Sequence, residues 1–136
     1  MASTIIGPPA NELAEALESV VDDELQVIAE YDSSSYNLLF VADQLLEPHG
    51  SLESIRSEAD TLFNYFHLDF LERELLEDLL WLGDVGTYVT FLDHGIIIRA
   101  QTDNAGAYIV MDVPASVDDV QIIIQNTLHD EFTTDY

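Results

Sequence analysis

Three β-rich runs between Thr87 and Val113 constrain the fold of this chain more than any other part of its sequence. They cover Thr87–Leu92, Ile96–Gln101 and Ala107–Val113, and they are dense in β-branched and aromatic residues. The short segments between them contain Asp, Asn and Gly, which tolerate the positive φ angles of tight turns. The pattern predicts a three-stranded antiparallel meander. The middle run opens with three isoleucines and is apolar on both faces, which predicts a central strand that other elements cover from both sides.

The residues before this meander predict first a helix and then a β-hairpin. Helical spacing of apolar residues places the helix at about 10–22, with Pro9 in its first turn. The hairpin consists of strands 25–31 and 36–42, joined by an Asp-Ser-Ser-Ser sequence whose side chains favour a chain reversal. Tyr31 and Tyr36 flank this turn and are expected to form a cross-strand aromatic pair.

Helical patterns also occupy residues 51–82 and the segment that follows the meander. Ser51 is a candidate cap for a first helical segment, and Asp69 with Glu72 has the spacing of a capping box that would open a second one. The sequence leaves open whether residues 51–82 form one helix or two. Ser116 is the expected cap of the last helix. The buried stripe of that helix is expected to comprise Val117, Val120, Ile123, Ile124 and Leu128.

The length and composition indicate a single soluble domain. A chain of 136 residues fits a single domain, 1–136, in which residues 1–8 and 130–136 are expected to be flexible. The absence of cysteine excludes disulfides, thiolate metal sites and cysteine nucleophiles. No run approaches the roughly 18 apolar residues of a membrane-spanning helix, and the N-terminal sequence lacks the pattern of a signal peptide. These features predict a cytoplasmic protein without a membrane segment.

The charge balance is extreme. The chain has 27 acidic residues, no lysine, and only Arg56, Arg73 and Arg99 as basic residues, which gives a formal net charge of −24. So much like charge weakens a compact state at ordinary ionic strength, whereas at molar salt the Debye length falls to about 3 Å and the repulsion is screened. We therefore expect a cytoplasm rich in salt. A mimic of nucleic acid is the competing interpretation, and direct nucleic-acid binding is close to excluded because the chain has almost no cationic side chains to neutralise phosphates.

The order of predicted elements is α-β-β-α(α)-β-β-β-α, which predicts an α+β fold. A hairpin and a meander would form a five-stranded antiparallel sheet with helices on both faces. This order resembles the roadblock/LC7 (dynein light-chain) fold and, more loosely, profilin-like sensor domains. The segments Tyr31–Asp43 and Trp81–Gly95 resemble a group of small acidic uncharacterised proteins of halophilic archaea. The roadblock resemblance implies homodimerisation through the sheet and the central helix, with a small GTPase or a signalling complex as partner.

The sequence contains no recognisable catalytic, metal-binding or cofactor-binding motif. The four histidines, His49, His67, His94 and His129, lack the spacing that places two imidazoles on one helical face. A phosphate-binding loop of the usual kind requires lysine, which is absent. His94 is expected at a hairpin turn, and His129 at the fraying end of the last helix.

The three arginines have ordinary structural interpretations. Arg99 follows the three isoleucines, so it is expected either to pair with a carboxylate such as Asp112 or to emerge at the end of the sheet, and anion binding is the alternative. Arg56 and Arg73 are expected to form helix-surface pairs with acidic residues four positions later, Asp60 and Glu77 respectively.

The leading functional hypothesis is a non-enzymatic regulatory or adaptor domain, a homodimer that acts through protein contacts. Its expected interface residues are Phe63, Phe70, Leu71, Leu75, Leu79 and Trp81. The alternative is a small-molecule-binding sensor domain with a pocket between sheet and helices. The expected ligand-binding residues of that pocket are Phe66, Tyr88, Phe91, Arg99 and Tyr108. A small hydrolase or isomerase is a third hypothesis, and it would need a cleft in which a histidine and a carboxylate converge.

Overall fold

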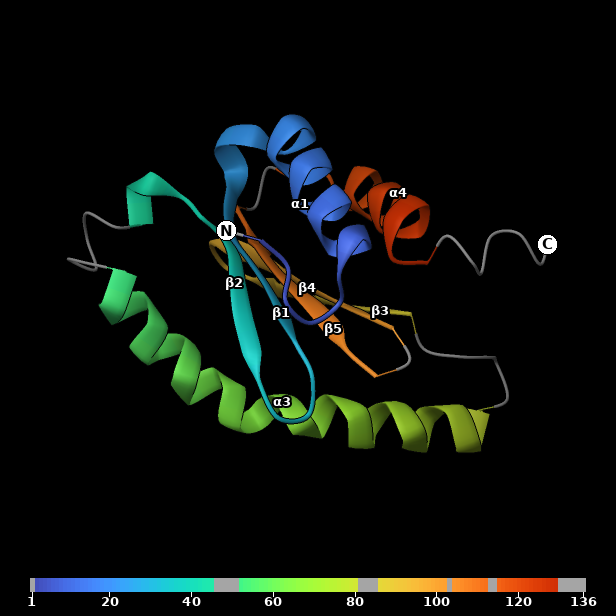
Figure 1. Cartoon of the computed structure of the whole chain (residues 1–136). Helices are drawn as coiled ribbons and strands as arrows, with labels where there is room; N and C mark the ends of the chain where they lie inside the picture. Colours follow the sequence, from blue (N-terminus) through green and yellow to red (C-terminus); the bar gives the residue numbers. More distant parts are fainter. Residues whose placement is uncertain (1, 46–51, 81–85, 103, 113–114, 130–136) are drawn as a thin grey trace.

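A five-stranded antiparallel sheet lies between two helical layers in the computed structural model, which describes residues 2–45, 52–80, 86–102, 104–112 and 115–129 (Figure 1). The elements in chain order are α1 (Pro8–Val20), a 3-10 turn η1 (Asp22–Glu24), β1 (Leu25–Tyr31), β2 (Tyr36–Val41), α3 (Leu52–Leu80), β3 (Thr87–Leu92), β4 (Gly95–Gln101), β5 (Gly106–Met111) and α4 (Val117–Thr127). Helices α1 and α4 lie side by side over one face of the sheet, and α3 crosses the other face. The predicted α+β class, element order and two-sided cover are confirmed.

The strand order is β2-β1-β5-β4-β3, which places β5 at the centre of the sheet. The expectation that the isoleucine-rich run forms the central strand is therefore wrong, because β4 is second from the edge. The meander itself is present, and the reason for the difference is the way the hairpin joins it. Strand β1 pairs with β5, with Ile28 opposite Ile109, so the last strand of the meander becomes internal.

The main core lies between the sheet and the layer formed by α1 and α4. Alternate residues of β4 and β5 point into it, among them Ile96, Ile98 and Ile109, and all three are almost completely buried. Leu13 and Leu17 of α1 and the predicted stripe residues Val120 and Ile124 of α4 pack against them. The N-terminus of α4 is capped as expected, since the Asp119 N–H donates to the Ser116 hydroxyl at 3.2 Å.

One carboxylate stabilises the turn between β1 and β2. The Asp32 side chain accepts the N–H groups of Ser34 and Ser35 at 2.8 and 2.7 Å, which confirms the predicted role of the turn residues. Tyr31 and Tyr36 lie directly opposite each other in the register, as expected. A bulge between Ile28 and Ala29 interrupts the pairing further along β1.

Residues 52–80 form one continuous helix, which answers the question that the sequence leaves open. The expected second start at Asp69 is wrong. A capping residue needs a non-helical backbone, and no proline or glycine interrupts residues 52–80 to provide a break. The described side chains of α3 are those of residues 53–64 and 70–78, so the candidate cap Ser51 lies outside the described residues.

The segment before α1 is tied to the sheet instead of forming the flexible lead-in that we expected. The Glu30 side chain, which has no exposed surface, accepts the backbone N–H groups of Thr4, Ile5 and Ile6 at 2.7, 3.2 and 2.9 Å. The Ser3 hydroxyl donates to the same carboxylate at 2.6 Å. Residues 3–6, here called the N-terminal strap, are therefore ordered around one buried acid. Residues 130–136, also expected to be flexible, lie outside the described residues.

The end of α4 is also more ordered than the sequence predicts. His129 is buried, and its Nε2 atom lies 2.7 Å from the carbonyl oxygen of Gln101. Its ring packs against Gly86, where an added Cβ atom would lie 3.2 Å from the imidazole. The expectation of a fraying histidine is wrong because this contact with the end of β4 holds the residue in place. His94 lies in the turn between β3 and β4, as predicted.

Candidate functional site

The α3 face of the sheet carries the features that bear on function, and aromatic pairs attach the helix to that face. The Phe63 ring lies 5.4 Å from the Tyr36 ring, and the Phe70 ring meets the Tyr31 ring edge to face at 5.8 Å. Because Phe63 and Phe70 are about two helical turns apart, both tyrosines beside the hairpin turn hold the middle of α3. Phe63 and Phe70 therefore pack within the chain.

Polar contacts reinforce this attachment on both sides of the aromatic pairs. The Tyr36 hydroxyl donates to the Asp60 carboxylate, and it lies 3.2 Å from the carbonyl oxygen of Arg56. Burial, together with the hydrogen bond to Asp60 and its negative charge, raises the pKa of Tyr36 to about 12. The Asp60 carboxylate thus accepts a hydrogen bond from Tyr36, whereas the sequence predicts that it forms an ion pair with Arg56.

Arg73 fixes the C-terminal half of α3. Its guanidinium donates to the Glu77 carboxylate at 3.2 Å, which confirms the predicted pair. The same guanidinium donates to the backbone carbonyl of Thr102 beside the β4–β5 turn. Arg73 therefore joins a residue on its own helix to the end of the sheet.

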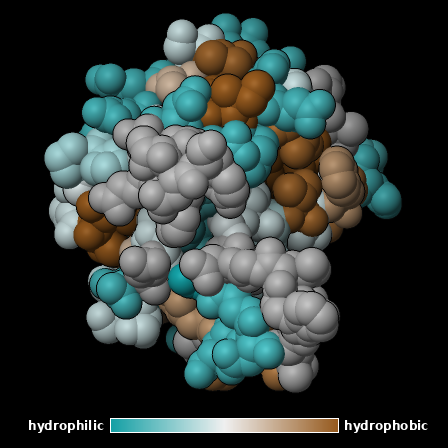
Figure 2. All heavy atoms as spheres, turned by 90° about the vertical axis from the view of Figure 1, so that its right-hand side faces the viewer, coloured by the Kyte–Doolittle hydropathy of each residue, from teal (hydrophilic) through white to brown (hydrophobic). Residues whose placement is uncertain are grey.

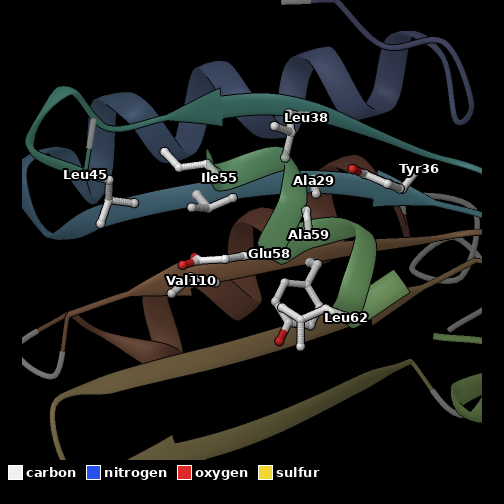
Figure 3. A pocket seen from close by; sticks show the side chains of 11 residues that line it. Ala29, Tyr36, Leu38, Leu45, Ile55, Glu58, Ala59, Leu62 and Val110 are labelled. Atoms are coloured by element: carbon white, nitrogen blue, oxygen red, sulfur yellow. The ribbon is translucent and has the colours of Figure 1, made fainter. Parts of the chain in front are cut away.

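A cavity of about 220 Å³ lies between the N-terminal half of α3 and strands β1, β2 and β5 (Figure 3). Its lining is mostly aliphatic, with two tyrosines and one carboxylate. The lining residues are Val27, Ala29, Tyr36, Leu38, Leu45, Ile55, Glu58, Ala59, Leu62, Tyr108 and Val110. The predicted pocket between sheet and helix therefore exists, but it lies over β1, β2 and β5.

The residues predicted to bind a ligand are spread over three places. Tyr108 lines the cavity. Tyr88 and Arg99 contact each other instead, with the Arg99 guanidinium 4.6 Å from the centre of the Tyr88 ring. Phe91 is 70% exposed on the edge strand β3. The Phe66 side chain lies outside the described residues.

The expected pairing of Arg99 with Asp112 is wrong. Arg99 lies opposite Tyr88 and Tyr108 in the sheet, whereas Asp112 lies four residues beyond Tyr108, about 13 Å along the strand. Asp112 instead accepts a hydrogen bond from the Gln26 amide at 2.8 Å.

The cavity residues that the sequence analysis missed carry a weak signal. Val27 and Ala29 are alternate positions of β1, and Ile55, Ala59 and Leu62 follow helical spacing. This pattern assigns them to a buried face. It does not show that the two faces leave space between them.

Two residues predicted to form an interface lie on the outer surface of α3. Leu71 and Leu75 are one turn apart and are 59% and 57% exposed. At roughly 100° per residue they lie about 90° and 130° around α3 from the side that carries Phe63 and Phe70. Leu79 and Trp81, the other predicted interface residues, lie outside the described side chains.

Strand β3 is the second place where apolar side chains reach the surface. Phe91 and Leu92 are 70% and 54% exposed, and β3 forms one edge of the sheet. Figure 2 shows separate apolar patches among hydrophilic side chains on one face of the molecule. The exposed apolar surface is therefore distributed over several elements.

Within the described ranges, no group of three or more His, Asp or Glu side chains is arranged to hold a metal. Among the helices of that part of the chain, none combines the length and hydrophobicity needed to cross a bilayer.

Comparisons with known proteins agree on the fold. The profile of a family described as "Domain of unknown function (DUF7522)" matches residues 11–129. No curated protein matches the sequence. MglB of Myxococcus xanthus is similar in structure, with a TM-score of 0.62 and 11% identity over 93% of this chain and 97% of that chain.

Two further solved structures show the same likeness. An MglB described as having a tetrameric arrangement gives a TM-score of 0.57 at 14% identity, over 93% of this chain and 88% of that chain. A roadblock/LC7 domain from Streptomyces avermitilis gives 0.50 at 10% identity, over 85% and 93%. These likenesses show that the fold is of the roadblock/LC7 type, as the order of elements predicts.

Proposed function

This chain belongs to the DUF7522 family, and we propose that it is a non-enzymatic regulatory or adaptor domain that acts through protein–protein contacts. The observation that carries this proposal is the pair of exposed leucines on α3, Leu71 and Leu75. They are exposed on a helix whose inner side is already attached to the sheet. Neighbouring exposed apolar side chains mark surfaces that contact a partner, whereas exposed apolar side chains scattered singly are ordinary.

The first partner in this proposal is a second copy of the chain. A dimer that pairs the outer surfaces of two α3 helices would bury Leu71 and Leu75 of both copies at a symmetric interface. The tetrameric arrangement of one similar MglB structure is consistent with self-association of this fold. Leu79 and Trp81 remain predicted members of the interface. Phe63 and Phe70 act in it indirectly, because they hold α3 in position.

The charge of the chain makes this association depend on salt. Each copy carries a formal charge of −24, so two copies repel each other strongly when their charges are not screened. At molar salt the Debye length is about 3 Å, and burial of apolar side chains can then dominate. We therefore place the protein in a salt-rich cytoplasm, such as that of a halophilic archaeon. A small GTPase or a signalling complex is the further partner that we propose for the dimer.

The test is the mass of the protein in molar KCl, measured by light scattering coupled to gel filtration. We expect a dimer for the natural chain and a monomer for the double variant Leu71→Glu/Leu75→Glu, with the same helical circular dichroism. The control is Ile122→Glu, which introduces one carboxylate, against two in the double variant, at a residue of α4 that is 55% exposed. This control should stay dimeric. A monomeric natural chain, or a dimeric double variant, would contradict the proposal.

The same variants test the further partner. Affinity purification from a halophilic host in molar KCl should recover a stoichiometric protein with the natural chain and with Ile122→Glu. Loss of that protein with the double variant would connect partner binding to the α3 surface. Equal recovery with all three chains would place the partner elsewhere.

A further inference from the structure

The cavity beneath α3 measures about 220 Å³ and is partly open to solvent. A small molecule can therefore enter it, which a closed packing void would not allow. An apolar cavity of about 150 Å³ in another protein stays dry and binds benzene. A space of the present size and lining can therefore hold a compact apolar group with about six to eight carbon atoms.

Small side chains on opposite walls create the space. Ala29 lies on β1 and Ala59 lies opposite it on α3, as Figure 3 shows, while Ile55 closes one side and is 7% exposed. A larger side chain at either alanine would fill the gap. The cavity opens to solvent beside Glu58 and Leu62, both of which are exposed residues.

The charges at the opening determine what can enter. Glu58 is the one charged side chain among the lining residues. The Asp60 carboxylate lies nearby, because it accepts the hydroxyl of the lining residue Tyr36, and the positive charge of Arg56 also acts on that hydroxyl. Arg99 lies directly opposite the lining residue Tyr108 in the sheet, so two carboxylates and two guanidiniums surround the opening, and Glu58 is the charged group that lines the cavity itself. A carboxylate ligand would also be repelled by the formal charge of −24.

We propose that this cavity is a binding site for a small organic cation with an apolar body. The apolar body would lie between Ala29 and Ala59, and its ammonium group would lie at the Glu58 carboxylate. This site goes beyond the adaptor function and does not depend on it. Glu58 and Leu71 are thirteen residues apart on α3, about 20 Å along the helix, and Leu71 lies on the outer side.

Three probes of equal chain length separate the contributions of shape and charge. Hexylammonium, hexanol and hexanoate are titrated into the full chain, and methyl signals of Ala29, Ile55 and Ala59 are followed by NMR at two KCl concentrations. We expect saturable shifts with hexylammonium, binding about threefold to fivefold weaker with hexanol, and no shift with hexanoate. The expected ratio corresponds to the strength of a solvent-exposed ion pair, and it should decrease at the higher salt concentration.

Two variants assign the effect to the cavity. Glu58→Gln should weaken hexylammonium binding to the level of hexanol, while Glu53→Gln, an exposed acid on the same helix, should leave binding unchanged. Ala59→Leu fills the cavity and should abolish binding of all probes. Because Glu58 and Glu53 are surface residues, their variants remain informative even if Ala59→Leu fails to fold. Non-saturable shifts, equal binding of hexanoate, or equal effects of the two glutamate variants would overturn the proposal.

Discussion

Replacing Glu30 by glutamine should release the N-terminal strap and cost a large part of the stability of the domain. The carboxylate accepts five hydrogen bonds, from the amides of Thr4, Ile5 and Ile6 and from the side chains of Ser3 and Asn37. Glutamine has nearly the same shape but replaces one acceptor oxygen by an NH2 group. If the glutamine oxygen keeps the contacts with Thr4, Ile5 and Asn37, its NH2 group faces the Ile6 N–H and the Ser3 hydroxyl, so two donors lose their acceptor.

The structure sets the size of the effect. Each of these partly buried donors that is left without an acceptor costs about 1 kcal/mol, so two of them predict a loss of about 2 kcal/mol in the free energy of unfolding. The matched control is Glu12→Gln on the exposed side of α1, which should change this free energy by less than about 0.5 kcal/mol. Denaturant titration of both variants in the same KCl concentration measures the difference. Amide hydrogen exchange at Thr4, Ile5 and Ile6 should accelerate only in the Glu30 variant.

The pH dependence gives an independent check. Burial alone would raise the pKa of the Glu30 carboxyl, but hydrogen bonds from Ile6, Ser3, Asn37 and Thr4 outweigh it and hold the pKa below its ordinary value. A lowered folded-state pKa stabilises the protein above the unfolded-state pKa, and this contribution is lost as the pH falls through the folded-state pKa. The stability gap between the natural chain and Glu30→Gln should therefore shrink in acid. A gap below about 0.5 kcal/mol at neutral pH, or unchanged strap exchange, would refute the reasoning.

Two further predictions concern the tyrosines that hold α3. Gly106→Ala should lower the free energy of unfolding by about 1 to 3 kcal/mol, because the added Cβ atom would lie 2.6 Å from the Tyr31 side chain. In a Tyr31→Ala background this loss should nearly vanish. Equal losses in both backgrounds, measured by denaturant titration, would contradict this contact. Asp60→Asn should lower the pKa of Tyr36 from about 12 toward its ordinary value of 10, because the hydrogen bond and the negative charge of Asp60 both favour the neutral phenol. Titration of the Tyr36 phenol by NMR measures this pKa. The contribution of Tyr36 to stability is present below pH 10 and is lost as the pH rises through the folded-state pKa, so in the variant it should be lost at lower pH. An unchanged titration would show that burial alone sets the pKa.

The strands are the part of this fold that local sequence specifies well. The predicted limits of β1 and β3 agree with the structure, because β-branched and aromatic runs bounded by turn residues leave few alternatives. The Asp32 turn and the Ser116 cap are also predictable, since each depends on side-chain contacts within three residues. Features that depend on short sequence separation were therefore accessible.

Features that depend on distant contacts were not accessible in the same way. In sequence, Glu30 looks like any of the 27 acidic residues, and its role appears only when Thr4 and Ile6 lie against it. The central position of β5 depends on which edge the hairpin pairs with, and no residue pattern specifies that choice. The cavity depends on the distance between α3 and the sheet at Ala29 and Ala59. The sequence analysis predicts a pocket from aromatic residues, whereas in the structure the small side chains of Ala29 and Ala59 create the space.

Because α3 is attached to the hairpin at its middle, a tilt of the helix moves its two ends in opposite directions relative to the sheet. The helix has 29 residues, about 44 Å along its axis. The rings of Phe63 and Phe70 contact the hairpin tyrosines near its midpoint. In the N-terminal half of α3, Ile55 lines the cavity. In the C-terminal half, Arg73 donates a hydrogen bond to the carbonyl of Thr102. A tilt that narrows the cavity would pull the opposite end of the helix away from the β4–β5 turn. An occupant of the cavity at one end of α3 and the contact with Thr102 at the other end would therefore influence each other through this helix.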